Sequence, residues 1–387
     1  MFYLKLTVRN IFRHKLRAML TITGLIVAIV AFGLMQTVVR AWYAGADMAS
    51  ANRLMTRNAI SLVFSMPGYY KERIRAVDGV TAVTTSNWFG GIYKDQSTTN
   101  FFPQFAVDHD NFFDLYPEFK VDPAQLAAWK ADRQGIMVGR LIADQHGFKI
   151  GDRLPIKGTI YPGTWDFVVR GIFEPKDNTT VTRQVYFHYD YLNEQMKKTA
   201  PRRADQVGIF VVQIADGSRA AEVSQAIDNE FRNSLSETLT ETEKAFQLGF
   251  VAQSEAIVVA IRIVSYVVIL IILAVVANTM AMTARERIAE YATLKALGFG
   301  PGYVARLIFF ESLVLTLIGG GLGILLTFPV AGAFKQAMGS MFPVFNVTPG
   351  TAALQFACAL AVGVLAALAP GYRASRVKIV DGLRHIG

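Results

Sequence analysis

The first residues to weigh for chemistry are Asp108, His109 and Asp110, because carboxylate and imidazole groups are common metal ligands. Side chains that follow one another in an extended chain point to alternate sides, so this triplet lacks the ligand spacing of a known metal site. We interpret it as a solvated turn. We expect no metal site and no catalytic residue in this chain.

Nucleotide chemistry would need a phosphate-binding loop of the form GxxxxGK[ST], which this sequence does not contain. The nearest glycine-rich run, GGGLG, lies in an apolar segment and is followed by Ile324 and Leu325. HExxH, GxSxG and CxxC are also absent, and the single cysteine, Cys358, can form no internal disulfide. We therefore expect a chain that is not an enzyme and binds no cofactor itself.

Residues 283–306 concentrate charge between two of the most apolar stretches of the chain. Good helix formers run from 284 to 297, and a break containing glycine and proline follows. This composition favours a helix that ends before the chain returns to an apolar environment, whereas a solvated loop is the simpler alternative. The residues that carry the pattern are Arg285, Glu286, Arg287, Glu290, Lys295, Ala296, Leu297 and Gly298.

Four apolar segments surround these features, and each is near or above the roughly 20 residues that cross a bilayer. Mean hydropathy is +0.32 and 52% of the 387 residues are hydrophobic, which is high for a purely soluble protein. The first segment is too long for the core of a secretory signal, so we predict an uncleaved span. The predicted spans are 18–40, 254–282, 307–334 and 351–370.

Positive charge is segregated along the chain. Residues 1–17, 283–306 and the tail 371–387 hold 13 Lys/Arg against three Asp/Glu, whereas residues 40–262 hold 25 against 26. Four spans place the three basic segments on one side, which the positive-inside rule identifies as the cytoplasm. We predict cytoplasmic termini, with 1–17 as an amphipathic helix on an anionic leaflet or simply a basic tail. The net charge of +9 then needs no nucleic acid as a partner.

Residues 41–253 lie between the first two predicted spans and would form an exported domain, whereas the loop 335–350 is short. Strand, helix and strand patterns occur in NAISLVF, MPGYYKERIRAV and GVTAVTTSNWF, and a further strand pattern in DQVGIFVVQIADG. Residues 41–88 and 204–253 would make one small α+β subdomain. Residues 89–203 would be an inserted, mostly β subdomain with a short helix.

Apolar residues recur at four-residue steps after Ser218, and neither proline nor glycine occurs before Gly249. The pattern predicts one long amphipathic helix that runs toward the second span and could transmit movement between the domain and the membrane. A plain packing helix is the alternative. The apolar positions are Val223, Ile227, Phe231, Leu235, Leu239, Phe246 and Phe250.

Three residues of the third span could make helix contacts. Gly319 and Gly323 form a small-xxx-small pair that permits close approach of a second helix, either within the chain or from a second copy. Glu311 is a charge inside the span, where it requires a partner or a function. We expect Ser312 or Asn278 to satisfy it in a packing role, with ion conduction as the alternative.

Four stretches carry a resemblance to a known family. They are LTVRNIFRHKLRAMLTITGLIVAIVAFGL, VGRLIADQHGFKIGDRLPI, ARERIAEYATLKALGFGPGYVARLIFFESLVLTLIGGGLGILL and APGYRASRVKIVDGLRH. The family that they resemble is that of the MacB/FtsX-type (type VII) ABC transporter permeases. The resemblance covers nearly the whole chain and is stronger in the membrane parts than outside them.

The resemblance implies four transmembrane helices plus a large α+β extracytoplasmic domain with porter-like and sabre-like subdomains. It implies a subunit of the bacterial cytoplasmic (inner) membrane that works as a homodimer or with a homologous permease. A separate cytoplasmic ABC ATPase would hold ATP and Mg, because only 17 residues precede the first span and a fused ATPase domain is expected to be missing. Residues 283–306 would then be the coupling segment that the ATPase contacts.

The function implied by the resemblance is coupling of ATP hydrolysis in that partner to conformational change in the periplasm. Export or efflux by mechanotransmission, with a periplasmic adaptor and an outer-membrane channel, is favoured by the size of the exported domain. The alternative is a non-transporting, FtsX-like regulator of a periplasmic enzyme such as a cell-wall hydrolase.

Overall fold

The computed structural model describes residues 12–47, 49–97, 99–177, 180–338 and 345–379. These residues divide into two compact units. We call residues 12–41, 255–338 and 345–379 the helical unit and residues 42–254 the mixed unit. Most of the predicted amphipathic helix 1–17 and the second half of the tail 371–387 lie outside the described residues.

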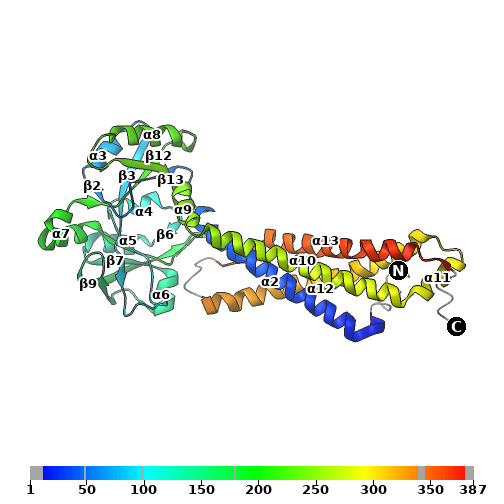
Figure 1. The fold of residues 1–387 in the computed structure, drawn as a ribbon. Helices are drawn as coiled ribbons and strands as arrows, with labels where there is room; N and C mark the ends of the chain where they lie inside the picture. The colour runs from blue at the N-terminus through cyan, green and yellow to red at the C-terminus, as the bar shows by residue number, and fades with distance from the viewer. Residues whose placement is uncertain (1–11, 48, 98, 178–179, 339–344, 380–387) are drawn as a thin grey trace. The chain divides into compact units, whose positions relative to one another are not determined.

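Four helices in the described chain are long and apolar enough to cross a membrane. They are α2 (Lys15–Asp47), α10 (Glu255–Glu286), α12 (Pro301–Met338) and α13 (Pro349–Ser375) (Figure 1). Two short elements accompany them, the 3₁₀ helix η1 (Phe12–His14) and α11 (Ile288–Ala296). The predicted fold class is confirmed, because a mixed α/β domain lies between the first and second of these membrane helices in the sequence.

An apolar core holds the helical unit together. All four long helices and α11 contribute to it, with Leu25, Val276, Tyr291, Ile308 and Val362 among the buried residues. Because α11 supplies a buried aromatic ring to this core, it is packed against the membrane helices. The core therefore joins the charged segment to the spans.

Polar side chains also connect the long helices. Gln36 Nε2 on α2 donates a hydrogen bond to Ser265 Oγ on α10 at 3.1 Å. Gln355 Nε2 on α13 donates to Ile29 O on α2 and to Thr327 Oγ1 on α12, each at 2.8 Å. An amide donor without a partner is costly in an apolar interior, so these bonds favour one register of the helices.

The mixed unit is built on an 11-stranded sheet. Its order is β13-β1-β12-β3-β5-β10-β7-β9-β8-β4, with β6 paired to β9 off this path, and β2 and β11 form a separate pair. The strands are β1 (Arg53–Asn58), β2 (Met66–Pro67), β3 (Val80–Trp88), β4 (Gly91–Ile92), β5 (Gln104–Val107), β6 (Phe119–Lys120), β7 (Gly135–Gly139), β8 (Arg153–Gly158), β9 (Gly163–Pro175), β10 (Val185–His188), β11 (Gln206–Val207), β12 (Ile209–Ile214) and β13 (Thr238–Thr242). The helices are α3 (Tyr70–Arg75), α4 (Phe112–Leu115), α5 (Pro123–Ala131), α6 (Arg140–His146), α7 (Tyr189–Thr199), η2 (Pro201–Arg203), η3 (Gly217–Arg219), α8 (Ala220–Glu230) and α9 (Glu243–Ala252).

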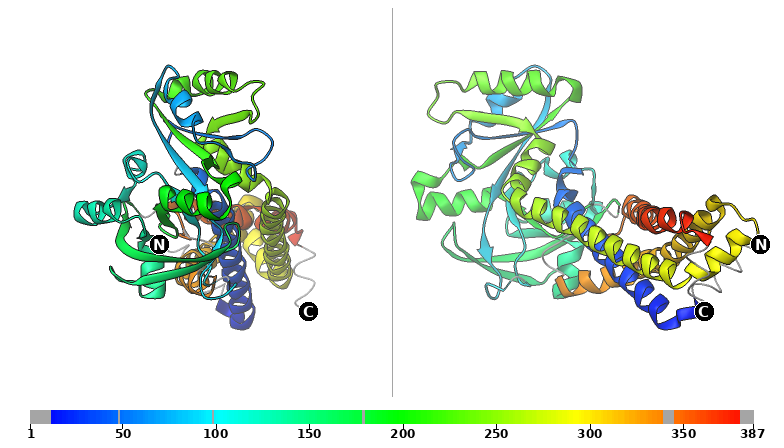
Figure 2. Two further views of the ribbon diagram at one scale, coloured as in Figure 1. Left: turned by 90° about the vertical axis from the view of Figure 1, so that its left-hand side faces the viewer. Right: turned by 45° about the vertical axis from the view of Figure 1, so that its right-hand side comes forward.

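The two expected subdomains of the mixed unit share this sheet, because β3 pairs antiparallel with β5. On the β3 side, α3 and α8 pack together on one face of the sheet (Figure 2), while α4 and α9 pack on the other. On the β5 side, α6 and α7 cover one face, and α4 and α5 the other. Alternate residues of each strand enter opposite cores, as the two-residue period of a strand requires.

The strand expected over NAISLVF is wrong. β1 ends at Asn58, and the chain that follows forms a loop in which Ile60 and Val63 are exposed. The Asn58 side-chain oxygen accepts a hydrogen bond from the Ile60 backbone N–H at 3.0 Å, which turns the chain away from the sheet. The strand lies instead in RLMTRN, directly before the apolar run.

The single long helix expected from residue 218 is also wrong, because β13 lies between α8 and α9. Asn233 has a φ of 59°, a left-handed conformation that interrupts a helix. Thr238 and Thr240 then alternate onto one side of β13 and donate hydrogen bonds to Asp228 at 2.8 and 2.7 Å. Pairing of β13 with β1 outweighs the four-residue apolar pattern, and Leu235 is left fully exposed.

Candidate functional site

The charged segment between α10 and α12 contains α11. Arg287 separates α10 from α11, with φ of −104° and ψ of 15° outside the α-helical range. The helix then turns Tyr291 and Ala292 inward, where both are fully buried. The segment is therefore a packed helix for much of its length and not a solvated loop.

Two ion pairs join this segment to η1 and to the beginning of α2. Arg17 contacts Glu286 through two guanidinium nitrogens, each 2.7 Å from a carboxylate oxygen. Arg13 pairs with Glu290. We did not expect either arginine at the site. The signal was present, however, because two arginines spaced by four residues face two glutamates with the same spacing.

Glu290 is held between two arginines. Arg287 Nε donates a hydrogen bond to Glu290 Oε2 at 2.8 Å, and Arg13 contacts the other carboxylate oxygen. Burial alone would raise the pKa of Glu290, but the hydrogen bonds from Arg287 and Arg13 outweigh it and lower that pKa below its ordinary value. The carboxylate is therefore kept charged and engaged within the chain.

Arg287 also contacts α12, where its Nη1 lies 3.0 Å from Glu311 Oε2. The two side chains are 12% and 5% exposed. Glu311 is thus satisfied by an arginine, and the expectation of Ser312 or Asn278 as its partner is wrong. Ser312 Oγ donates instead to Gly363 O on α13 at 2.8 Å. The arginine could not be found from spacing, because it stands 24 residues from Glu311.

The end of α11 is a tight turn. Gly298 has a φ of +91°, the Gly298 N–H donates to Lys295 O at 3.0 Å, and the Phe299 N–H donates to Leu294 O at 3.1 Å. These two bonds are those of a Schellman motif, in which glycine takes the left-handed position. At the turn itself, Ala296, Leu297 and Gly298 are exposed, and Leu297 is 71% exposed.

Lys295 connects the turn to the end of α13. Its Nζ donates to Ser375 O at 2.6 Å and to Val377 O at 2.8 Å. η1, α11 and the end of α13 therefore meet at one end of the helical unit, which we call the α11 end (Figure 1). Arg285, near the end of α10, is exposed at this same end.

The two glycines of α12 pack within the chain. A Cβ added at Gly319 would lie 2.7 Å from Leu25 Cδ2, and one at Gly323 would lie 2.9 Å from Ile29 Cβ. Both contacts are to α2. Close approach of α2 and α12 within one chain therefore accounts for the spacing of Gly319 and Gly323.

The Asp108–His109–Asp110 triplet lies at a turn that follows β5. One ligand atom of each side chain lies within 4.8 Å of the others, so the side chains converge more than an extended chain allows. Asp108 is paired with Lys71, and His109 Nδ1 lies 3.6 Å from an Asp190 carboxylate oxygen. Burial alone would raise the pKa of Asp108, but the Lys71 ammonium outweighs it and lowers that pKa. A cation of the protein thus already neutralises the best-buried carboxylate.

Two stretches of the chain match known protein families. Residues 18–230 match the MacB-like periplasmic core domain, and residues 262–379 match the FtsX-like permease C-terminal domain. The first match alone covers more than half of the chain.

Curated relatives have similar descriptions. The uncharacterized ABC transporter permease YvrN of Bacillus subtilis (strain 168) is 25% identical over an alignment of 419 positions. The alignment covers 99% of this chain and 99% of that protein. The macrolide export ATP-binding/permease protein MacB of Shewanella sp. (strain W3-18-1) is 26% identical over 245 residues, which cover 59% of this chain and 35% of that protein. The chain thus matches nearly all of the first relative and about a third of the second.

Solved structures align with about half of the chain at low identity. The periplasmic region of MacB from Actinobacillus actinomycetemcomitans aligns over 52% of this chain and 94% of that chain, with 9% identity and a TM-score of 0.37. The extracellular domain of the ABC-type transporter YknZ from Gram-positive bacteria aligns over 49% of this chain and 100% of that chain, with 10% identity and a TM-score of 0.36.

Proposed function

The chain belongs to the MacB/FtsX-type ABC transporter permeases, and from this premise we propose that it couples ATP hydrolysis by a separate cytoplasmic ATPase to movement of its extracellular domain. It is a membrane protein with an extracellular domain. ATP and Mg²⁺ would be bound by the partner, since this sequence contains no phosphate-binding loop.

The observation that carries the proposal is the way α11 is held. Ion pairs and hydrogen bonds connect α11 and its flanks to η1 and α2, to α12 and to the end of α13. Just beyond the helix, Leu297 and Phe299 are 71% and 42% exposed. Exposed apolar side chains beside charged groups have the composition of a protein contact surface. A partner that pushed on this turn would displace three membrane helices through contacts already in place.

A second permease subunit is part of the proposal. Only 17% of the most apolar stretch of α10 is buried within the chain, against 33–39% for the other three long helices. Among the four long helices, α10 therefore leaves the largest share of its apolar stretch free to pack against a second copy of the chain or a homologous permease.

Export or efflux by mechanotransmission is the transport activity that we favour. The extracellular part spans more than 200 residues and forms its own compact unit, which supplies surface for a periplasmic adaptor and an outer-membrane channel. The description of the Shewanella relative as a macrolide export protein supports this direction. The cytoplasmic position of both termini follows from the segregation of positive charge.

The test is capture of the ATPase. The full chain would be tagged in its own organism, and the complex purified from that organism would be assayed for ATP hydrolysis in nanodiscs. We expect the ATPase to be retained. Failure to capture any ATPase would contradict the proposed function.

A substitution at the exposed turn tests the site. Leu297→Asp places a charge on an exposed side chain without removing a buried contact, and we expect it to reduce ATPase capture at least tenfold. Leu235→Asp in the mixed unit is the matched control, because Leu235 is also exposed. Equal capture by both variants and the unmodified chain would remove the turn from the coupling site. ATPase capture together with activation of a periplasmic hydrolase and no export would instead favour the regulatory function.

A further inference from the structure

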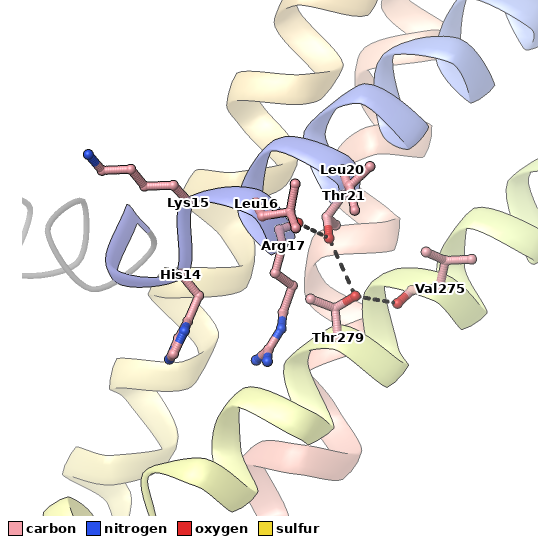
Figure 3. Close-up of a pocket in the computed structure, with 8 residues that line it drawn as sticks. All are labelled: His14, Lys15, Leu16, Arg17, Leu20, Thr21, Val275 and Thr279. Carbon is pink, nitrogen blue, oxygen red and sulfur yellow. Dashed lines mark hydrogen bonds between the residues drawn. The ribbon is translucent and has the colours of Figure 1, made fainter.

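Two cavities of the described chain differ in how their polar groups are arranged. The first is a groove of about 590 Å³ at the beginning of α2 (Figure 3). Lys15 extends away from His14 and Arg17 there, and His14 and Arg17 face Glu286 instead. The groove thus has no shared charged end, and its other wall is α10, the helix that we assign to the second permease subunit. The second cavity lies within the mixed unit, and its polar groups converge.

This second cavity, which we call the sheet pocket, opens on the face of the large sheet that α4 and α9 cover. Its lining includes Ser86 and Ile209 on the sheet and Phe246 on α9, all from one half of the mixed unit. Phe105 of β5 and Phe119 of β6 come from the inserted half. The volume is about 260 Å³, just below the roughly 300–1,000 Å³ of sites for drug-sized molecules, so a ligand here must be small.

One arginine and two carboxylates line the sheet pocket. Buried Arg53 donates through Nε to Glu243 Oε2 at 2.9 Å and through Nη1 to Glu118 Oε2 at 3.1 Å. Glu243 Oε2 also accepts from the Ser50 N–H, whereas Glu243 Oε1 accepts no hydrogen bond from any residue that the structure describes. The N-terminus of α9 offsets part of the excess negative charge, and exposed Asp114 in an adjoining cavity adds to it. The charge that remains is negative.

Two phenol hydroxyls face the same charged group. Tyr186 is only 4% exposed. Burial raises the pKa of Tyr186 most, and the nearby Tyr116 and Glu118 raise it further. Burial also raises the pKa of Tyr116, with Glu243 as the next contribution, so both phenols stay protonated. Neither hydroxyl makes a hydrogen bond within the described part of the chain, although a buried phenol usually has a partner.

Aromatic rings supply much of the remaining lining. The rings belong to Phe105, Phe112, Tyr116, Phe119, Tyr186 and Phe246. Aromatic faces attract cations as well as apolar groups, and a carboxylate oxygen forms its strongest hydrogen bonds with charged donors. An ammonium group on a small apolar body satisfies both requirements. An anion would instead meet the excess negative charge.

We propose that the sheet pocket binds a small organic amine in its ammonium form, with the nitrogen at Glu243 Oε1 and the hydroxyls of Tyr116 and Tyr186. The apolar body of the amine would lie among the phenylalanine rings. Because the lining comes from both halves of the mixed unit, a bound amine would join them. The site needs neither the ATPase nor a second permease subunit, so the inference goes beyond the proposed function.

The experiment is isothermal titration calorimetry of the purified full chain in detergent micelles at pH 7, with titration into empty micelles subtracted. The probe is 2-phenylethylamine, which is protonated at this pH as a lysine side chain is. The neutral 2-phenylethanol and the anionic 3-phenylpropionate are its matched controls. We expect the amine to bind about tenfold more tightly than either control, because it alone donates charged hydrogen bonds.

Two substitutions locate the amine. Tyr186→Phe removes only a hydroxyl without a partner in the described chain, and should weaken amine binding about tenfold. Tyr69→Phe is the matched control, because Tyr69 is exposed and lies outside the sheet pocket. Glu243→Gln should abolish the preference for the amine over the alcohol. Thermal unfolding of each variant checks its fold, and Tyr186→Phe decides the matter if Glu243→Gln does not fold.

Three outcomes would overturn the proposal. Absence of saturable amine binding would mean that the sheet pocket takes no such ligand. Equal affinity for the amine and the alcohol would show that the pocket does not select a cation. Equal amine binding by the Tyr186 and Tyr69 variants would place the amine elsewhere. The titration uses no ATPase, so its failure leaves the proposed coupling function untouched.

Discussion

Arg13 and Arg287 both contact Glu290, but the two contacts contribute differently to stability because the arginines differ in exposure. The Arg13 side chain is 62% exposed, so water and salt screen its pair and the gain in stability is small. Arg287 is 12% exposed and also meets Glu311, which is 5% exposed. Removing one member of such a buried ion pair strongly destabilises a protein, because the other charge is left without a counter-charge. At the scale of single residues, Arg287 is therefore the main link between α11 and the membrane helices.

Replacing Arg287 with leucine is expected to destabilise the protein by about 3–5 kcal/mol, because the Glu311 carboxylate then remains buried without a counter-charge. The measurement is denaturant unfolding of the purified protein in detergent micelles. The double variant Arg287→Leu/Glu311→Leu should recover most of the loss. Arg13→Leu is the control, with an expected effect below about 1 kcal/mol. Arg287→Leu that is no more harmful than Arg13→Leu would contradict this role.

Spacing and distance decide how much of the site could be predicted. The helical segment with its glycine stop was predictable, because helix formers and a left-handed glycine are local signals. The pairing of Arg13 and Arg17 with Glu290 and Glu286 could have been found from their matched spacing. The partner of Glu311 could not, because only the packing of α11 against α12 brings Arg287 to it.

At the scale of elements, α11 is a short helix whose two ends are fixed by different devices. Arg287 breaks the helical path at its beginning, and the Schellman turn at Gly298 ends it. A helix of nine residues is marginal by itself. Its persistence depends on the buried Tyr291 and on these two ends.

Gly298→Ala is expected to loosen the end of α11, because a residue with a Cβ at a φ of +91° loses about 1–2 kcal/mol. Hydrogen–deuterium exchange of a peptide covering residues 288–300 measures the effect, and exchange should be about 5–30-fold faster. Gly300→Ala is the control, since both glycines have open space around them and only Gly298 has a positive φ. Equal exchange in the two variants would show that the turn does not hold α11.

The predicted elements that were wrong share one cause. The spacing of apolar residues predicted a strand over NAISLVF and a helix through Leu235 and Leu239. The strands of the sheet formed instead at β1, before NAISLVF, and at β13, which contains Leu239. The alternating threonines of β13 pair with β1, which is far away in the sequence. The spacing of apolar residues within four positions cannot predict such a long-range pairing. The four spans were predictable because length and apolarity are sufficient for them.

At the scale of the whole molecule, charge separates the α11 end from the rest of the chain. The three basic segments hold 13 Lys/Arg against three Asp/Glu, and ion pairs and hydrogen bonds bring parts of all three together. Residues 40–262 have nearly balanced charge. Such segregation orients a membrane protein with its basic end in the cytoplasm.

Cysteine labelling tests this orientation, because Cys358 is the only cysteine and can be replaced by alanine. Val63→Cys, in the exposed loop after β1, should react with an impermeant maleimide added to spheroplasts. Gly300→Cys, next to α11, should react only after the membrane is opened. The reverse pattern would contradict the predicted orientation, and labelling of both sites in intact spheroplasts would show that the membrane had leaked and would require a sealed preparation.

The pairing of β3 with β5 restricts how this domain can be shortened. β3 has nine residues, and β5 pairs with the last three of them, Ser86 to Trp88, on the side that faces away from β12. Removal of residues 89–203 would also free the backbone donors and acceptors of Ser86 to Trp88, and so lengthen an edge on which further chains can add and aggregate. The intact sheet ends instead in the short strands β4 and β13, of two and five residues. The inserted half thus covers the end of β3 and shortens the edge that the other half would expose.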